Sequence, residues 1–306
     1  MRVLLTGASG FVGSGVLDYL LGHTEWEFVC PCSWRHKGNP LNISPSGRVE
    51  VVTCDLAGPL PDMGDFDFIL NLASESHVDR SIAEPVMFIE NNVSLVLQML
   101  EYARRCKKLR AFVQFSTDEV YGATEHEEWD VLLPGNPYSA SKAAQEMIAL
   151  AYWRTYGVPV VITNSNNVVG KGQHPEKFVP KIAKLIKADQ EVVIHTTPKG
   201  PGRRFYNPVE NIADALLFIL GLPVHSYSAQ RNKPDRYNLS GGEEYDNLEM
   251  AELVAKLLNK PLWYRLVSAQ SVRPGYDEFY PRTEGQLTKL GWTPPISLEE
   301  GLKRWL

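Results

Sequence analysis

The chain has 306 residues, of which 44% are hydrophobic and 22% charged, which suits one large domain or a domain with an appended lobe. Its net charge of −5 and isoelectric point of about 5.9 argue against a nucleic-acid groove or a polybasic membrane contact. The sequence has no apolar run of membrane-spanning length and no basic leader before its first apolar segment, so we expect a soluble, cytoplasmic protein.

A glycine-rich turn follows the first apolar segment. Residues 2–5 predict a strand. Residues 6–13 then read Thr-Gly-Ala-Ser-Gly-Phe-Val-Gly, and an expected helix at 11–21 begins within this segment. This glycine spacing allows a tight turn and close backbone approach, and the N-terminus of the following helix suits a pyrophosphate. The pattern therefore predicts a dinucleotide site that includes Gly7, Gly10, Phe11, Val12 and Gly13.

Apolar runs alternate with amphipathic segments through the first half of the chain. This alternation predicts an α/β fold over residues 1–165, with a Rossmann-type, doubly wound parallel sheet covered by helices on both faces. Ligands of such sheets gather at the carboxyl ends of the strands, where Ala73 and Ser116 lie. The expected strands are 27–30, 49–54, 67–70, 111–116 and 158–164, and the expected helices are 85–105 and 138–156.

Beyond about residue 165 the pattern loosens, with loops rich in glycine, proline and charge at 170–177 and 198–204. No role is assigned to residues 223–235. We expect residues 166–306 to form mainly a smaller substrate-binding lobe, interleaved with the first region in one compact unit. Its expected helices are 178–187, 209–220, 247–258 and 298–306.

The four cysteines are Cys30, Cys32, Cys54 and Cys106. Cys30 and Cys32 lack the spacing of a zinc knuckle or a thioredoxin motif, and no histidine cluster accompanies them. We therefore expect free thiols and no metal site.

The groups that carry chemistry lie in the middle of the chain. Residues 115–122 read Phe-Ser-Thr-Asp-Glu-Val-Tyr-Gly, and Tyr138 and Lys142 follow, four residues apart, on one face of an expected helix. A lysine ammonium beside a phenol favours the phenolate and lowers the tyrosine pKa, so we expect Tyr138 to act as a base near neutral pH. Thr117 would hydrogen-bond the same hydroxyl.

Asp118 and Glu119 offer an acid and a second base. Adjacent residues of a regular strand point to opposite faces of a sheet. Both carboxylates can serve one substrate only if they lie just past the strand end, where the backbone turns.

Taken together, the motifs resemble the extended short-chain dehydrogenases/reductases, and more narrowly the nucleotide-sugar 4,6-dehydratases, above all those that act on dTDP-glucose. The resemblance implies dehydration of a nucleotide-activated glucose to the 4-keto-6-deoxy sugar, by transient oxidation at C4 with a bound nicotinamide cofactor. The matching segments are 71–81, 137–143, 175–180, 273–277 and 290–294.

By position, the resemblance implies a role for each catalytic candidate. Tyr138 would take the proton of the sugar O4, Thr117 would share that hydrogen bond, and Lys142 would hold the nicotinamide ribose. Once C4 is a ketone, Glu119 would remove the C5 proton, and Asp118 would protonate the departing C6 hydroxyl.

The resemblance also implies substrate contacts. Arginine forks suit a diphosphate, and Arg203 is an alternative to its neighbour Arg204 in that role. The implied contacts are Arg204 and Arg273 at the diphosphate, Asn167, Lys177 and Asn247 along the nucleotide-sugar, Ser76 and Val78 near the hexose, and Tyr276 near the nucleotide.

The second expected strand ends differently from that of NAD-using members, which place an aspartate there to bind the adenosine ribose. This chain has Cys32, followed by Ser33 and Arg35, and a hydroxyl with nearby cations would accommodate a 2′-phosphate. Because the rest of the chain resembles NAD-dependent members, NAD is the first choice of cofactor and NADP the alternative. Asp55 and Leu56 match the adenine contacts, and Ala73 completes the expected cofactor set.

Two other functions stay open. A nucleotide-sugar 4-epimerase, or a dehydratase of another sugar nucleotide, would also use Tyr138 and Lys142, but a simple epimerase needs no C5 base such as Glu119. The missing ribose carboxylate favours a second alternative, a non-catalytic cofactor-binding protein. The resemblance further implies a homodimer that pairs through the helices at 85–105 and 138–156.

Overall fold

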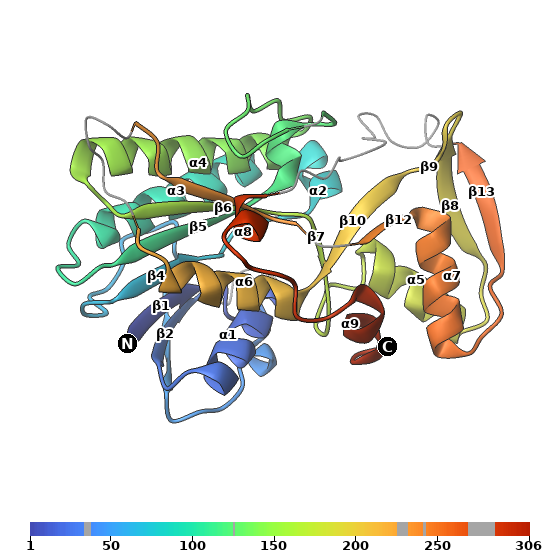
Figure 1. Cartoon of the computed structure of the whole chain (residues 1–306), viewed down its shortest axis with the longest axis horizontal. Coiled ribbons are helices and arrows are strands. Elements are labelled where there is room, and N and C mark those ends of the chain that lie inside the picture. Colours follow the sequence, from blue (N-terminus) through green and yellow to red (C-terminus); the bar gives the residue numbers. More distant parts are fainter. Residues whose placement is uncertain (34–37, 125, 225–231, 241–242, 269–284) are drawn as a thin grey trace.

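The structure is a computed structural model, and it describes residues 1–33, 38–124, 126–224, 232–240, 243–268 and 285–306. Seven strands form one sheet in the order β11-β6-β5-β4-β1-β2-β3, and every neighbouring pair is parallel (Figure 1). The predicted Rossmann-type parallel sheet is confirmed. Its strands are β1 (Arg2–Thr6), β2 (Glu27–Cys32), β3 (Val49–Thr53), β4 (Phe68–Asn71), β5 (Ala111–Thr117), β6 (Val160–Ser165) and β11 (Asp235–Leu239).

Helices cover both faces of this sheet (Figure 1). Because side chains alternate along a strand, Val3 and Leu5 join the core beneath α1 (Phe11–His23) and α6 (Val209–Gly221). Leu4 joins the opposite core, and the buried faces of two long helices complete it. These helices are α3 (Pro85–Ala103), which follows the short α2 (Val78–Ala83), and α4 (Pro137–Tyr156).

The start and end of α4 follow from local sequence. The Asn136 side chain accepts from the Ser139 amide in a capping box, Pro137 occupies the first turn, and Gly157 ends the helix at φ +70°. This cap places Tyr138 in the first turn and Lys142 one turn later.

A smaller layer lies at the far end of the molecule (Figure 1). One three-stranded sheet has the order β12-β10-β7, another has the order β13-β8-β9, and helices α5 and α7 share a core with β8. The elements of this layer are β7 (Asn167–Val169), α5 (Phe178–Lys187), β8 (Val192–Thr197), β9 (Gly200–Pro201), β10 (Arg203–Pro208), β12 (Glu243–Asp246), α7 (Asn247–Leu258), β13 (Tyr264–Ser268) and α9 (Leu298–Lys303). The large part also contains α8 (Gln286–Lys289), whose Leu287 joins the core with Val3, and the 3₁₀ turns η1 (Pro40–Asn42) and η2 (Asp118–Tyr121).

The second half of the chain crosses between the two parts. β11 is a strand of the large sheet and α6 packs in the core beside that sheet, while β10 and β12, which precede and follow them in the chain, lie in the smaller layer. The loop predicted at 198–204 is wrong in part, since β9 and the start of β10 lie there. The helix predicted at 298–306 ends earlier, at Lys303. No helix in the described ranges combines the length and apolarity that a membrane crossing requires.

Candidate active site

A cavity of about 410 Å³ opens at the carboxyl ends of the large sheet. It runs from the glycine turn before α1, past the ends of β2 and β3, to the start of α4 and the segment after β7. The predicted site residues that line it are Gly7, Gly10, Phe11, Val12, Gly13, Cys32, Ser33, Asp55, Leu56, Ala73, Ser76, Thr117, Glu119, Tyr138, Lys142, Asn167 and Lys177.

Other predicted site residues are placed differently. Among the described residues, Val78, Asp118, Arg204 and Asn247 do not belong to the cavity lining. Val78 begins α2. Asn247 begins α7, and its backbone amide donates to the Gly202 carbonyl at 3.1 Å. Arg35, Arg273 and Tyr276 lie outside the described residues.

The glycine turn has the geometry of a phosphate site. Gly7 has a φ of +75°, and a Cβ on Gly13 would lie 2.1 Å from the Gly7 carbonyl oxygen, so neither position tolerates a side chain. Gly10 caps α1 without a side-chain hydrogen bond, which leaves the first amides of the helix to a ligand. These features fit the pyrophosphate of a dinucleotide.

At the adenosine end of the cavity, the described residues at the end of β2 bring no carboxylate, in agreement with the sequence. Cys32, buried at the strand end, lies beside Ser9, whose carbonyl also accepts from the Asn42 side chain at 2.9 Å. Asp55 follows β3 instead, where its Oδ1 accepts from the Ala57 amide at 3.0 Å. Asp55 is therefore the carboxylate that the described residues place at this end of the cavity.

The carboxylate pair lies where the geometry of a strand requires it. β5 ends at Thr117, and the 3₁₀ turn η2 begins at Asp118, so the prediction that both carboxylates lie past the strand end is confirmed. The Thr117 hydroxyl donates to Asp118 at 3.2 Å, and the Asn166 amide donates to its other oxygen at 3.1 Å. Burial raises the pKa of Asp118 to about 6, against the effect of these donors. Asp118 can therefore carry a proton near neutral pH.

Glu119 is half-buried and points into the cavity lining. Burial, and then the charge of Asp118, raise its pKa, while Lys177 and Arg204 lower it. The Asn136 amide lies 3.5 Å from its Oε2, so the residue that caps α4 also contacts this carboxylate.

Lys142 and Tyr138 are both buried, and the structure corrects one expectation about them. The Lys142 ammonium donates to the Phe115 carbonyl and to Gln145 Oε1, each at 2.7 Å, and burial lowers its pKa to about 7. The pKa of Tyr138 is raised, chiefly by burial and then by Glu119 and Asp118, although a hydrogen bond with Thr117 lowers it. The prediction that Lys142 lowers this pKa is wrong here, because the ammonium is held by two other acceptors.

Contacts in the smaller layer separate the two candidate diphosphate arginines. Arg203 contacts three carboxylates, those of Glu244 at 3.2 Å, Asp246 at 3.6 Å and Glu249 at 3.3 Å. Arg204 instead lowers the pKa of both Asp118 and Glu119, so its charge reaches the catalytic turn.

The mouth of the cavity is bridged by two segments. The Lys177 ammonium donates to the Ser76 carbonyl at 3.1 Å, and His77 Nε2 lies 3.2 Å from Glu176. Lys177 and Ser76 therefore meet across the cavity.

Sequence reasoning missed three amide side chains that hold the catalytic groups: Asn136 at Glu119, Gln145 at Lys142 and Asn166 at Asp118. A signal for Asn166 exists, because a run of polar residues ends β6, but the prediction selected its neighbour Asn167. Nothing in the local sequence points to Gln145.

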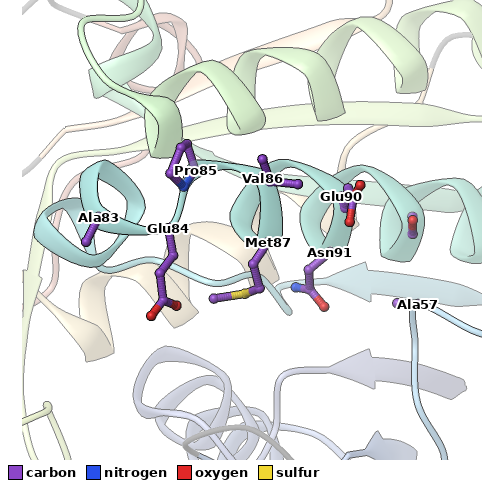
Figure 2. A pocket seen from close by; sticks show the side chains of 9 residues that line it. Ala57, Ala83, Glu84, Pro85, Val86, Met87, Glu90 and Asn91 are labelled. Carbon is purple, nitrogen blue, oxygen red and sulfur yellow. The ribbon is translucent and has the colours of Figure 1, made fainter.

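A second hollow, of about 670 Å³, lies beside this cavity along α3 (Figure 2). Glu84, Met87 and Asn91 point to the same side of the helix there, and the hollow shares Ala57 and Asn91 with the cavity. None of the predicted site residues lines it. Among the described residues, no group of three or more His, Cys, Asp and Glu side chains could hold a metal ion.

Comparisons with known proteins agree with this geometry. The model of the NAD dependent epimerase/dehydratase family matches residues 3–239. A trifunctional UDP-glucose 4,6-dehydratase/epimerase/reductase of Arabidopsis thaliana is 33% identical over 99% of the chain, which spans about half (46%) of that relative's length. The dTDP-glucose 4,6-dehydratase of Salmonella typhimurium is 31% identical, with 99% of this chain and 91% of the relative covered.

Among solved structures, the dTDP-glucose 4,6-dehydratase DesIV from Streptomyces venezuelae, crystallised with NAD, superposes with a TM-score of 0.84. It is 30% identical, and the match covers 99% of this chain and 95% of that one. The family model covers well over half of the chain, and the Salmonella relative is matched over nearly its whole length. This chain belongs to the NAD dependent epimerase/dehydratase family.

Proposed function

We propose that this protein is a nucleotide-sugar 4,6-dehydratase that converts a nucleotide-activated glucose, dTDP-glucose first, to the 4-keto-6-deoxy sugar with NAD as cofactor. The observation that carries the proposal is the catalytic turn: two carboxylates with raised pKa values beside Tyr138, at the inner end of a cavity that begins at a dinucleotide turn. Epimerisation at C4 needs no such pair.

The cofactor would lie along the cavity. The glycine turn and the first amides of α1 would bind the pyrophosphate, Asp55 and Leu56 the adenosine end, and Lys142 the nicotinamide ribose. Bound NAD⁺ would accept hydride from C4 and return it to C6, and its positive ring would favour the Tyr138 phenolate.

Each catalytic residue has a task that its surroundings support. Tyr138 would take the O4 proton, with Thr117 in the same hydrogen bond. The C4 ketone acidifies the C5 proton, which Glu119, at the cavity wall, would remove and would return to C5 once the hydride has reached C6. Burial raises the pKa of Asp118 to about 6, so this carboxyl keeps a proton to higher pH than an exposed aspartate, and it would deliver that proton to the departing C6 hydroxyl, which leaves as water.

Asp118 is absent from the cavity lining, so a small movement of the substrate or of η2 would accompany that last proton transfer. Substrate contacts are proposed at Ser76, Asn167 and Lys177, which line the cavity, and at Arg204, whose charge reaches the carboxylates. We propose that the smaller layer, within residues 166–306, supplies most of the substrate site.

We also propose that the protein works in the cytoplasm as a homodimer. Its cysteines are free thiols, as suits a reducing compartment. Large apolar side chains are exposed on the outer faces of the two long helices, with Val86 at 65% exposure and Ile89, Leu97 and Met147 at 40–43%. Covering them would pair α3 and α4 of two copies.

The proposal is tested by incubating the purified protein with dTDP-glucose and, separately, UDP-glucose, with NAD⁺ or NADP⁺ supplied. We expect a product lighter by one water with a new C6 methyl signal in the proton NMR spectrum. A product of unchanged mass with inverted C4 would instead identify an epimerase. Unchanged sugar in every tube, together with tight cofactor binding, would favour a non-catalytic protein.

A further inference from the structure

A buried ion pair lies behind the catalytic groups. Arg236 of β11 contacts Glu146 of α4, and their side chains are only 1% and 0% exposed. Burying two charges is costly unless each is fully partnered, so a pair at this depth has to be satisfied by its neighbours. The sequence analysis assigned neither residue a role.

Hydrogen bonds connect the pair to the catalytic turn. Arg236 Nε donates to Asn164 Oδ1 at 3.0 Å, and the Asn164 amide nitrogen lies 2.7 Å from Glu146 and 3.1 Å from the Thr117 carbonyl. The guanidinium also lies over the ring of Tyr121, 5.1 Å from its centre. Arg236 therefore contacts Tyr121, the last residue of η2, directly. Through the Asn164 amide it is also linked to Thr117, the residue that precedes η2.

The pair also affects the pKa of Lys142. Glu146 lies one turn after Lys142 on the same face of α4, and its charge raises the pKa of that ammonium. Burial raises the pKa of Glu146, and the charge of Arg236 opposes this rise more strongly than that of Lys142 does. The negative charge of Glu146 is thus neutralised mainly by Arg236. The Lys142 ammonium instead donates to two neutral acceptors, the Phe115 carbonyl and the Gln145 side chain.

Other groups face Arg236 from the loop that follows η2. Its guanidinium lies 4.9 Å from the Trp129 ring centre. Burial lowers the pKa of His126, and the charge of Arg236 lowers it further, while Asp130 and Glu128 raise it. The pKa of Lys142 responds to burial and to Glu146.

We propose that Arg236 is a positioning residue for the dehydration reaction: it neutralises Glu146, which leaves Lys142 free to bind the cofactor ribose, and through Asn164 it holds the turn that begins at Thr117. The inference rests on the proposed function for its catalytic part. If Arg236 is removed, the buried Glu146 carboxylate has Lys142 as its remaining cation, and the ammonium turns from the cofactor toward Glu146.

Four proteins test this: wild type, Arg236→Met, Glu146→Gln, and the double variant that carries both substitutions. With Arg236→Met we expect kcat to fall by about 10–100-fold, as for a modest misplacement of catalytic groups, with the alkaline limb of the kcat profile moved to higher pH. Glu146→Gln moves that limb to lower pH, because Lys142 loses its anionic neighbour. The double variant returns it close to the wild-type position.

Three controls accompany these proteins. Arg236→Lys keeps a cation and restores part of kcat. Arg265→Met makes the same substitution at an exposed ion pair with Glu191, at 3.0 Å on β13, and leaves both kcat and the pH profile unchanged. Thermal unfolding of every variant separates loss of fold from loss of function.

The affinity for NAD⁺ gives a readout that needs no turnover. It is measured by quenching of protein fluorescence between pH 6 and 9, a range that spans the Lys142 pKa of about 7 by about one unit or more on either side. We expect its pH dependence to shift in the same opposite directions in the two single variants. If the NAD⁺ affinity has the same pH midpoint in all four proteins and the wild type makes the product, the role of Arg236 is refuted and the proposed function is not. Shifted midpoints with a wild type that makes no product would refute the proposed function and leave the coupling intact.

Discussion

The buried Asp118 makes a prediction that joins function to stability. Its pKa is raised by burial from the ordinary 3.8 to about 6, so folding favours the neutral carboxyl. Its contribution to stability is fully present below pH 3.8 and is lost as the pH rises through about 6. Since each pKa unit is worth about 1.4 kcal/mol, the ionised carboxylate destabilises the fold by about 3 kcal/mol at pH 8 and by about 1 kcal/mol at pH 4.5.

Asp118→Asn removes this charge while keeping the shape of the side chain. We therefore expect the variant to be more stable than the wild type, by about 1 kcal/mol at pH 4.5 and about 3 kcal/mol at pH 8. This gain requires the Asn166 amide to rotate so that its oxygen accepts from the new amide, and the energy of that hydrogen bond is subtracted if the rotation does not occur. The variant should also lose water elimination, because an amide cannot supply the proton.

The assay is urea unfolding followed by circular dichroism at the two pH values, with the same NAD⁺ concentration in every sample. Asp18→Asn, at an exposed position on α1, is the matched control and should change the free energy of unfolding by less than about 0.5 kcal/mol at either pH. A variant no more stable than the wild type at pH 8, or a gain equal at both pH values, would refute the reasoning about Asp118.

Three further predictions concern the chemistry, the cofactor and the assembly. Glu119→Gln should still take hydride from C4, seen as the absorbance of reduced nicotinamide, but should lose at least about 100-fold in water elimination; a wild-type rate of product formation would rule out its role as the C5 base. Titration of unliganded protein should give tighter binding of NAD⁺ than of NADP⁺, and the reverse order would overturn the choice of cofactor. Leu97→Glu, on the exposed face of α3, should convert a dimer to a monomer in sedimentation, whereas a wild type that is already monomeric would contradict the proposed pairing.

The large sheet was predictable because its strands are short apolar runs between amphipathic helices. The exception is β11, which reads Asp-Arg-Tyr-Asn-Leu and carries two charged residues in a buried strand. Charged residues are depleted in strands, and Arg236 is tolerated there only because Glu146, 90 residues earlier, meets it in the folded chain. Such a partner cannot be identified from local sequence.

The candidate site shows the same division. Spacing along a helix correctly places Tyr138 and Lys142 in one cavity, and the alternation of strand residues correctly places Asp118 and Glu119 beyond the end of β5. The direction of the Tyr138 pKa could not be read from spacing, because it depends on burial and on the Phe115 carbonyl and Gln145 side chain that hold Lys142. The choice between Arg203 and Arg204 likewise depends on the register of β10 against β12, which brings Asp246 opposite Arg203.

The most direct test of the central claim follows one atom through the reaction. The wild-type protein is incubated with dTDP-glucose that carries deuterium at C4, and the product is examined by mass spectrometry and NMR. A dehydratase that oxidises C4 and returns the same hydride to C6 predicts loss of one water and a methyl group that carries one deuterium. A sugar of unchanged mass that keeps its deuterium at C4 with the configuration there inverted would contradict the account and identify an epimerase.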